Sequence, residues 1–244
     1  MRHTVSTGGV LRRKGAWTRH GRFGYVRRGK GLRPLSAQST GRKGMNEMHI
    51  SMAEENIAAA VLDVYAPYIE KTAITFETAV PDEAAFAARM GSIRRNYPYL
   101  VCEAGGKVLG YAYAAMHKER AAYQWGLELS IYVREGFTGR KIGSALYTAL
   151  TGMLRLQGIC NVYGCVTLPN KPSEALLRAF GFTLLGVFHK TGYKCGMWHD
   201  VGWYEAFIGT HEPNPAPPLP VDALAPEQIA AMLRAGERVL AAPV

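Results

Sequence analysis

Residues 137–143, FTGRKIG, form a turn whose residue types suit phosphate binding. Glycine and basic residues meet there, between a strand-like stretch and a helix-like one. The N-terminus of a helix offers backbone N–H groups without intrahelical partners and the positive end of the helix dipole, so anions bind there readily. Taken alone, the pattern more often belongs to a solvated basic turn that merely begins a helix. The neighbouring elements are needed to distinguish a phosphate-binding turn from a solvated basic turn.

The stretch before the turn, residues 127–133, alternates apolar and polar side chains and predicts a strand. The apolar face comprises Leu127, Leu129, Ile131 and Val133. The polar face comprises Glu128, Ser130 and Tyr132. A carboxylate such as that of Glu128 can serve as a general base. It is also an ordinary outward-facing residue of an alternating strand.

A mixed α/β domain is predicted over residues 48–211. A helix follows the turn, because apolar residues recur at helical spacing from Ile142 to Leu154, and Gly158 suits its C-terminal cap. Before the alternating strand, the patterns predict a strand at 49–53, two helices at 54–69 and 81–98, and a hairpin at 99–116. After the helix they predict a strand at 159–167, a helix at 173–180 that Gly181 ends, and two further strands.

Residues 1–47 are predicted to be a disordered, Arg- and Gly-rich extension. Of the 29 Lys and Arg residues, 12 lie in residues 1–44 without any Asp or Glu, so the other 17 face all 19 acidic residues. Three accounts of this extension are open. It is an untranslated upstream stretch with Met45 or Met48 as the working start, an organelle-targeting segment, or a nucleic-acid-binding arm. We favour the first, because patterned sequence begins only at His49.

Residues 212–244 are predicted to form a Pro-rich linker and then a helix that opens at Pro226. The apolar face of that helix packs either on the domain or on a second subunit.

The remaining composition argues against several classes of protein. The four cysteines contain no Cys-x-x-Cys pair, and the seven histidines show no metal-ligand spacing. No stretch reaches the length of a transmembrane helix. We therefore expect a reduced, cytoplasmic protein without a metal.

The alternating strand, the turn and the later stretch LPNKPSEALLRAFGF resemble, in order and spacing, the Gcn5-related N-acetyltransferase (GNAT) superfamily. Six stretches, among them KERAAYQWGLELSIYV and GYKCGMWHDVGWYE, resemble its phosphinothricin N-acetyltransferase branch. The resemblance implies an α/β fold with a mixed central sheet, in which a splayed strand pair binds acetyl-CoA. It also implies acetyl transfer to phosphinothricin, methionine sulfoximine or methionine sulfone, with no metal, by a protein that is a homodimer.

On this resemblance, the cofactor-binding residues are expected to be Ile131, Tyr132, Val133, Gly139, Arg140, Lys141, Ile142, Gly143, Ser144 and Asn170. Three residues depart from the family pattern. Thr138 stands where Gln or Arg is usual, and Lys141 stands where the first Gly of the turn belongs. If Lys141 is helical in φ/ψ, its Cβ points away and its ammonium can pair with a phosphate. Leu177 replaces the His or Tyr that is a candidate acid or base.

The resemblance makes Glu128 the catalytic base, which takes a proton from the substrate ammonium before a direct attack on the thioester. Expected substrate-binding residues are Phe76, Lys118, Arg120, Tyr123, Tyr147, Trp198 and Val201, with Asp200 as a further contributor. The alternatives are acetylation of another small amine or of a protein N-terminus, or a non-catalytic binding module whose basic tail binds nucleic acid. Nucleic acid is otherwise not expected as a partner.

Overall fold

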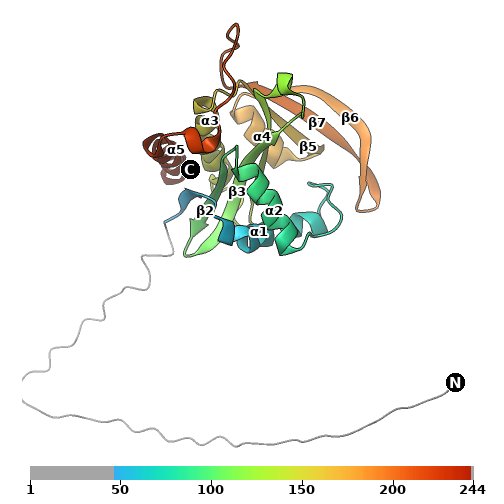
Figure 1. Ribbon diagram of the computed structural model, residues 1–244. Coiled ribbons are helices and arrows are strands. Elements are labelled where there is room, and N and C mark those ends of the chain that lie inside the picture. The colour runs from blue at the N-terminus through green and yellow to red at the C-terminus, as the bar shows by residue number, and fades with distance from the viewer. Residues whose placement is uncertain (1–46, 243–244) are drawn as a thin grey trace, which may run out of the picture. The chain divides into compact units, whose positions relative to one another are not determined.

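A single mixed β-sheet with helices against both of its faces makes up the described part of the protein, residues 47–242 of the computed structural model (Figure 1). Its strands are β1 (His49–Met52), β2 (Tyr99–Ala104), β3 (Lys107–Met116), β4 (Gly126–Val133), β5 (Asn161–Leu168), β6 (Thr183–Lys194) and β7 (Met197–Phe207). Their order across the sheet is β1-β2-β3-β4-β5-β7-β6. Of these neighbouring pairs, only β4 and β5 run parallel.

The helices are α1 (Ala58–Lys71), α2 (Glu83–Arg94), α3 (Ile142–Leu156), α4 (Lys171–Ala179) and α5 (Pro226–Ala241). They divide the core into two layers. On one face, α1 and α2 cover alternate residues of β2 and β3, such as Val101 and Tyr111. On the other face, α3 buries its apolar stripe against the opposite residues, such as Leu100 and Ala112. The two-residue period of the strands thus sends neighbouring side chains into different layers.

Local signals explain where the helices begin and end. The Asp82 side chain accepts a hydrogen bond from Ala85 N–H at 2.7 Å and so caps α2. Past the end of α3, Gly158 has a φ of +87°, the left-handed conformation that favours glycine after a helix. The second helix was predicted to extend towards Pro98, but it ends at Arg94. A turn follows, in which the N–H groups of Asn96 and Tyr97 share the Ile93 carbonyl.

The C-terminal helix α5 packs against α3 and β1 of the same chain. Two glycines allow a close approach. A Cβ on Gly236 would lie 2.6 Å from the Ala145 carbonyl oxygen, and one on Gly152 would lie 2.4 Å from Met232 Sδ. The Pro-rich segment before α5 is also fixed, because Gln157 Nε2 donates to the Leu219 carbonyl at 2.7 Å. The sequence left open whether this helix packs on its own domain or on a second subunit. In the structure, α5 packs on the domain of its own chain.

The structure confirms the predicted α/β class and the predicted order of strands and helices. The N-terminal basic extension, predicted at residues 1–47, lies outside the described residues apart from Glu47.

Candidate active site

The parallel strands β4 and β5 separate immediately after Glu128. They pair only as Gly126 with Asn161, Leu127 with Val162, and Glu128 with Tyr163. Beyond that point β4 stays with β3, whereas β5 stays with β7 along its whole length. A gap therefore opens in the middle of the sheet, and Glu128 lies at its closed end.

Backbone N–H groups of β4 face this gap. Arg134 N–H, one residue past β4, donates to the Leu109 carbonyl of the β3 side at 2.7 Å. Alternate residues of an antiparallel strand direct their N–H groups to opposite sides. The N–H groups of Val133 and Ile131 therefore point away from β3 and into the gap. The Tyr68 hydroxyl donates to the Val133 carbonyl and holds this part of the strand.

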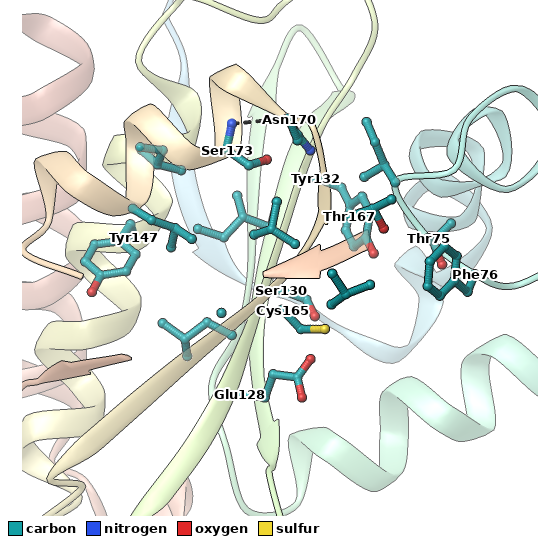
Figure 2. A pocket seen from close by; sticks show the side chains of 18 residues that line it. Thr75, Phe76, Glu128, Ser130, Tyr132, Tyr147, Cys165, Thr167, Asn170 and Ser173 are labelled. Carbon is teal, nitrogen blue, oxygen red and sulfur yellow. Dashed lines mark hydrogen bonds between the residues drawn. The ribbon is translucent and has the colours of Figure 1, made fainter. Parts of the chain in front are cut away.

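A cavity of about 260 Å³ occupies the gap and is lined from both faces of the sheet (Figure 2). Glu128, Ser130 and Cys165 reach it from the polar face, and Tyr147 reaches it from α3 on the other face. Leu177 of α4 also lines it. Among the described residues that line it there is no Lys, Arg or His, so Glu128 supplies the charge of this cavity.

Burial changes the acid–base properties of the groups in the cavity. Burial raises the pKa of Glu128 above its ordinary value of 4.5, which makes the carboxylate a stronger base. Burial, and after it the charge of Glu128, raises the pKa of the Cys165 thiol to about 11. Cys165 is therefore a protonated, weakly nucleophilic thiol near neutral pH. The cavity holds a basic carboxylate beside an inert thiol.

The basic turn forms a second hollow, of about 400 Å³, at the N-terminus of α3. Thr138, Gly139, Lys141 and Ser144 line it. Both hollows share several lining residues, so they adjoin. The shared residues are Ile74, Ile131, Asn170, Ser173 and Leu176. A polar helix terminus is thus connected to the carboxylate-bearing gap.

Lys141 is not helical in φ/ψ. The pairing of its ammonium with a phosphate was expected only for a helical conformation, so that condition is not met. Its φ of 61° and ψ of 5° are left-handed, the conformation that a glycine at this position would adopt most readily. Its Nζ donates to the Ala242 carbonyl at 3.1 Å, at the end of α5. The neighbouring Arg140 guanidinium lies 4.9 Å from the centroid of the Phe137 ring, outside the lining of the hollow.

Asn170 lies where the two hollows meet and begins α4 (Figure 2). Its side-chain oxygen accepts a hydrogen bond from Ser173 N–H at 3.2 Å, and its own N–H donates to Glu174 at 3.1 Å. It is therefore a helix cap on the wall of the site. Its cofactor contact remains a prediction.

The segment after α1 forms the far wall of the cavity with Ile74, Thr75 and Phe76. The Tyr65 hydroxyl and Thr75 Oγ1 are 2.7 Å apart, and Lys194 Nζ donates to the Thr75 carbonyl at 2.7 Å. The Phe76 ring lies so close to Gly192 that a Cβ there would be 2.1 Å from it. Strand β6 thus holds Phe76 at the cavity.

The other predicted substrate-binding residues divide into two groups. Tyr147 and Val201 are buried and line the cavity. Lys118, Arg120 and Tyr123 form a separate hollow in the loop between β3 and β4, where Lys118 Nζ lies 5.4 Å from the Tyr123 ring centroid. Outside both hollows, Trp198 is exposed on β7, and Asp200 contacts His189.

Several lining residues were missed from the sequence. Cys165 and Thr167 face the gap because they alternate with buried Val166 on β5, a pattern visible in the sequence. Ser173 and Leu176 face it through α4, and Thr75 through a long loop. For the last three, no short pattern in the sequence reveals the placement.

Within residues 47–242, no group of three or more His, Cys, Asp or Glu side chains is arranged to hold a metal ion. Over the same stretch, every helix falls short of the length and apolarity that crossing a bilayer demands.

Comparison with known proteins places this geometry in a family. Residues 50–203 match the model of the acetyltransferase (GNAT) domain. The chain is 38% identical over 163 residues to a phosphinothricin N-acetyltransferase of Streptomyces viridochromogenes, covering 67% of this chain and 87% of the relative. It is 32% identical over 161 residues to an L-methionine sulfoximine/L-methionine sulfone acetyltransferase of Pseudomonas paraeruginosa, covering 63% and 92%.

A solved structure resembles the fold as well. The crystal structure of a GNAT superfamily phosphinothricin acetyltransferase from Sinorhizobium meliloti, in complex with AcCoA, is similar with a TM-score of 0.68. The two chains are 31% identical, and the match covers 72% of this chain and 97% of the other.

Proposed function

The chain belongs to the GNAT acetyltransferase family and is an acetyl-CoA-dependent N-acetyltransferase, and on that premise we propose that its acceptor is the α-amino group of a phosphinothricin-like amino acid. The candidates are phosphinothricin, methionine sulfoximine and methionine sulfone, because related enzymes carry these substrates in their names. The observation that carries the proposal is a basic carboxylate, Glu128, at the point where β4 and β5 separate.

Acetyl-CoA supplies an acetyl group activated as a thioester, and the two adjoining hollows suit a molecule of that shape. The N-terminus of α3, with the N–H groups of Ile142, Gly143 and Ser144, suits the phosphates. The gap beside Ile131 suits the thioester end. The left-handed Lys141 preserves the backbone shape of a glycine, which keeps the turn compatible with a phosphate.

Glu128 acts as the general base in this proposal. Amines of amino acids are mostly ammonium near neutral pH, so one proton must leave before the nitrogen can attack. Burial raises the pKa of Glu128. The proton affinity of its carboxylate is therefore closer to that of the amine. The backbone N–H groups of Ile131 and Val133, directed into the gap, stabilise the negative charge that develops on the thioester oxygen. One such donor contributes about 2.7–4 kcal/mol.

Transfer is direct, without an acetylated enzyme residue. Cys165 is a cysteine in the cavity, but its thiol pKa of about 11 leaves almost no thiolate at neutral pH. Leu177 also lines the cavity and has no proton to give. The CoA thiolate leaves without a dedicated acid, because a thiol pKa near 8.5 makes it a tolerable leaving group.

The acidic groups of the amino acid bind the basic residues of the loop between β3 and β4. The cavity itself offers no cation among its described lining residues, whereas Lys118 and Arg120 form the hollow in that loop. The loop begins beside Glu128, because Ala115 pairs with Glu128 on the adjacent strand. Arg120 grips a carboxylate or phosphinate with paired hydrogen bonds.

A homodimer is the second part of the proposal. Large apolar side chains are exposed on the hairpin of β6 and β7, and such patches mark protein contacts. They are Leu184, Leu185, Phe188, Tyr193, Met197 and Trp198. Strand β6 is also a sheet edge. Light scattering should give twice the chain mass for the full chain, and Trp198→Glu should shift it towards one chain; a monomeric full chain would contradict the dimer.

The acceptor is tested by following thiol release from acetyl-CoA with the full chain. Phosphinothricin, methionine sulfoximine and methionine sulfone are offered separately, with spermidine and an alanine-initiated peptide as comparison amines. We expect saturable turnover with at least one of the three amino acids and much lower kcat/KM for the comparison amines. Preference for spermidine or the peptide would replace the proposed acceptor with another amine.

A further inference from the structure

Among the ion pairs of the described residues, the one that involves the Glu128 carboxylate has His117 as its basic partner. Its Nδ1 lies 3.8 Å from Glu128 Oε2. That distance exceeds a hydrogen bond by less than 1 Å, so a small rotation of the carboxylate makes the contact. His117 comes directly after β3, whose residue Ala115 pairs with Glu128. The sheet register therefore fixes the backbone positions from which the two side chains approach each other.

The Nδ1 atom of His117 is buried and, within residues 47–242, has no hydrogen-bond partner. Its ring is held between aromatic neighbours, with the Tyr163 centroid 4.5 Å away and the Trp203 centroid 5.2 Å away. A buried polar atom without a partner is costly and calls for an explanation. The stacking fixes the ring while leaving Nδ1 directed at the Glu128 side, and the side chain keeps 18% exposure as a route to solvent.

The electrostatic surroundings bring the proton affinities of the two groups together. Burial raises the pKa of Glu128. Burial, and after it the charge of Lys118, lowers the pKa of His117. An ordinary histidine exceeds an ordinary glutamate by about two pKa units, so both shifts reduce the difference. The free-energy change for moving a proton between them is therefore smaller than for the two ordinary groups.

The other titratable groups near the pair do not compete for this proton. Tyr113 on β3 and Tyr163 on β5 have pKa values that burial raises, and they remain neutral. Cys165 on β5 remains a thiol. Besides the pair, the charges that act on these groups are Lys118, next in the chain, and Glu205 on β7, which acts on Tyr163. Arg89 and Glu77 act on Tyr113.

We propose that His117 is a positioning residue that acts through Glu128, accepting at Nδ1 the proton that Glu128 has taken from the substrate amine. This inference rests on the proposed function, in which Glu128 is the base. The amine loses one proton to a Glu128 oxygen, and that proton moves to Nδ1 of a neutral His117. Glu128 is a carboxylate again, and the imidazolium releases the proton to water. Leu177, on the other wall of the cavity, has no group that can accept a proton. The relay residue therefore comes from the segment directly after β3.

Two variants of the full chain test the relay. His117→Phe keeps an aromatic ring between Tyr163 and Trp203 but removes both ring nitrogens. His117→Asn keeps a hydrogen-bonding group near Nδ1 that does not titrate. The matched control is His49→Asn, which removes another histidine beside a glutamate, at 3.6 Å from Glu103 on β1 and β2. Thermal unfolding of each variant reports whether the fold is kept.

The pH profile of kcat is the reading that a merely structural role would not change. Reaction through the relay needs Glu128 ionised and His117 neutral, so the acid limb of log kcat for the unmodified chain approaches a slope of two. In both variants the slope falls to one, and the plateau rate falls about tenfold. KM for acetyl-CoA stays within about twofold, because neither group lies in the phosphate hollow. His49→Asn keeps the original profile.

A double variant separates failure of the relay from failure of the proposed function. If His117 acts through Glu128, adding His117→Phe to Glu128→Gln leaves the residual rate unchanged. A further tenfold loss would show an independent role and overturn the relay. Unchanged slope and plateau in His117→Phe, with Glu128→Gln inactive, would overturn the relay alone. Full activity of Glu128→Gln would overturn the base and the relay together.

Discussion

The gap between β4 and β5 and the turn before α3 belong to one site, but they are built in different ways. The turn is local, because residues 137–144 supply its glycines, its basic side chains and its helix terminus. The gap is long-range, because its walls come from the loop after α1, from β4, β5 and β7, and from α3 and α4. The turn can be recognised as a sequence pattern, whereas the gap exists only where the folded strands β4 and β5 separate.

This difference between the turn and the gap separates the residues expected to bind the cofactor from those expected to carry out acyl transfer. Backbone N–H groups at a helix terminus bind phosphate whatever the side chains are, so we expect the turn to tolerate Thr138 and Lys141. In the proposed mechanism, Glu128 in contrast depends on burial, on the strand separation and on the backbone N–H groups facing the gap to act as a base for acyl transfer. We therefore expect changes in the gap to alter kcat and changes in the turn to alter KM for acetyl-CoA.

The largest effect is expected from Glu128→Gln. The amide keeps the size of the side chain but cannot take a proton, so kcat near neutral pH should fall by roughly 100-fold or more. KM for acetyl-CoA should stay within about twofold. Steady-state thiol release with saturating amine measures both. Equal losses in kcat and in acetyl-CoA binding would contradict the division between gap and turn.

The next effect concerns the acceptor side of the gap. Arg120→Ala removes a charged hydrogen-bonding group, typically about 1.5–3 kcal/mol, so KM for the amino acid should rise roughly 10- to 100-fold. KM for acetyl-CoA should not change. The matched control is Arg95→Ala, an exposed arginine just after α2. If both variants behave alike, Arg120 does not bind the substrate.

A smaller effect is expected from Gly139→Ala in the turn. Gly139 has a φ of +77°, which an alanine adopts at a cost of about 1–2 kcal/mol. The strained turn should raise KM for acetyl-CoA by up to about tenfold and leave kcat at saturation unchanged. Gly136→Ala is the control, because its φ of +80° carries the same strain and it does not line the hollow. A matching rise in Gly136→Ala would point to general destabilisation.

The smallest effect is expected from Lys141→Gly, and its direction is an improvement. Glycine removes the left-handed strain at this position, so KM for acetyl-CoA should fall by about two- to threefold. Lys141→Ala keeps the strain but loses the contact with Ala242, and it should not lower KM. A lower KM in both variants would mean that the ammonium, and not the backbone strain, limits binding.

Elements with a clear period could be predicted from the sequence. The alternation of Leu127 to Val133 and the stripe from Ile142 to Leu154 gave β4 and α3, and both patterns arise from burial on one side. The cap at Asn170 also follows a local pattern, because Asn favours the N-cap position. These features depend on neighbours within a few residues.

Placement across the fold could not be predicted in the same way. Lys194 donates to the Thr75 carbonyl 119 residues away, and this is one of the contacts that hold the Phe76 segment. The α5 helix could have packed on a second subunit, but glycines at 152 and 236 fit it to α3. His117 gave no signal beyond a lone histidine, because its contact with Glu128 depends on the register of β3 and β4.

The pH profile of kcat for Glu128→Gln beside that of the unmodified chain, with saturating amino acid and acetyl-CoA between about pH 5 and 9, tests the central claim most directly. A base works when deprotonated, and burial raises the pKa of Glu128 above 4.5, so kcat of the unmodified chain should fall as pH falls through that raised pKa. The variant should stay at a low rate and lack this titration. A variant that retains both the rate and the titration would show that Glu128 is not the base.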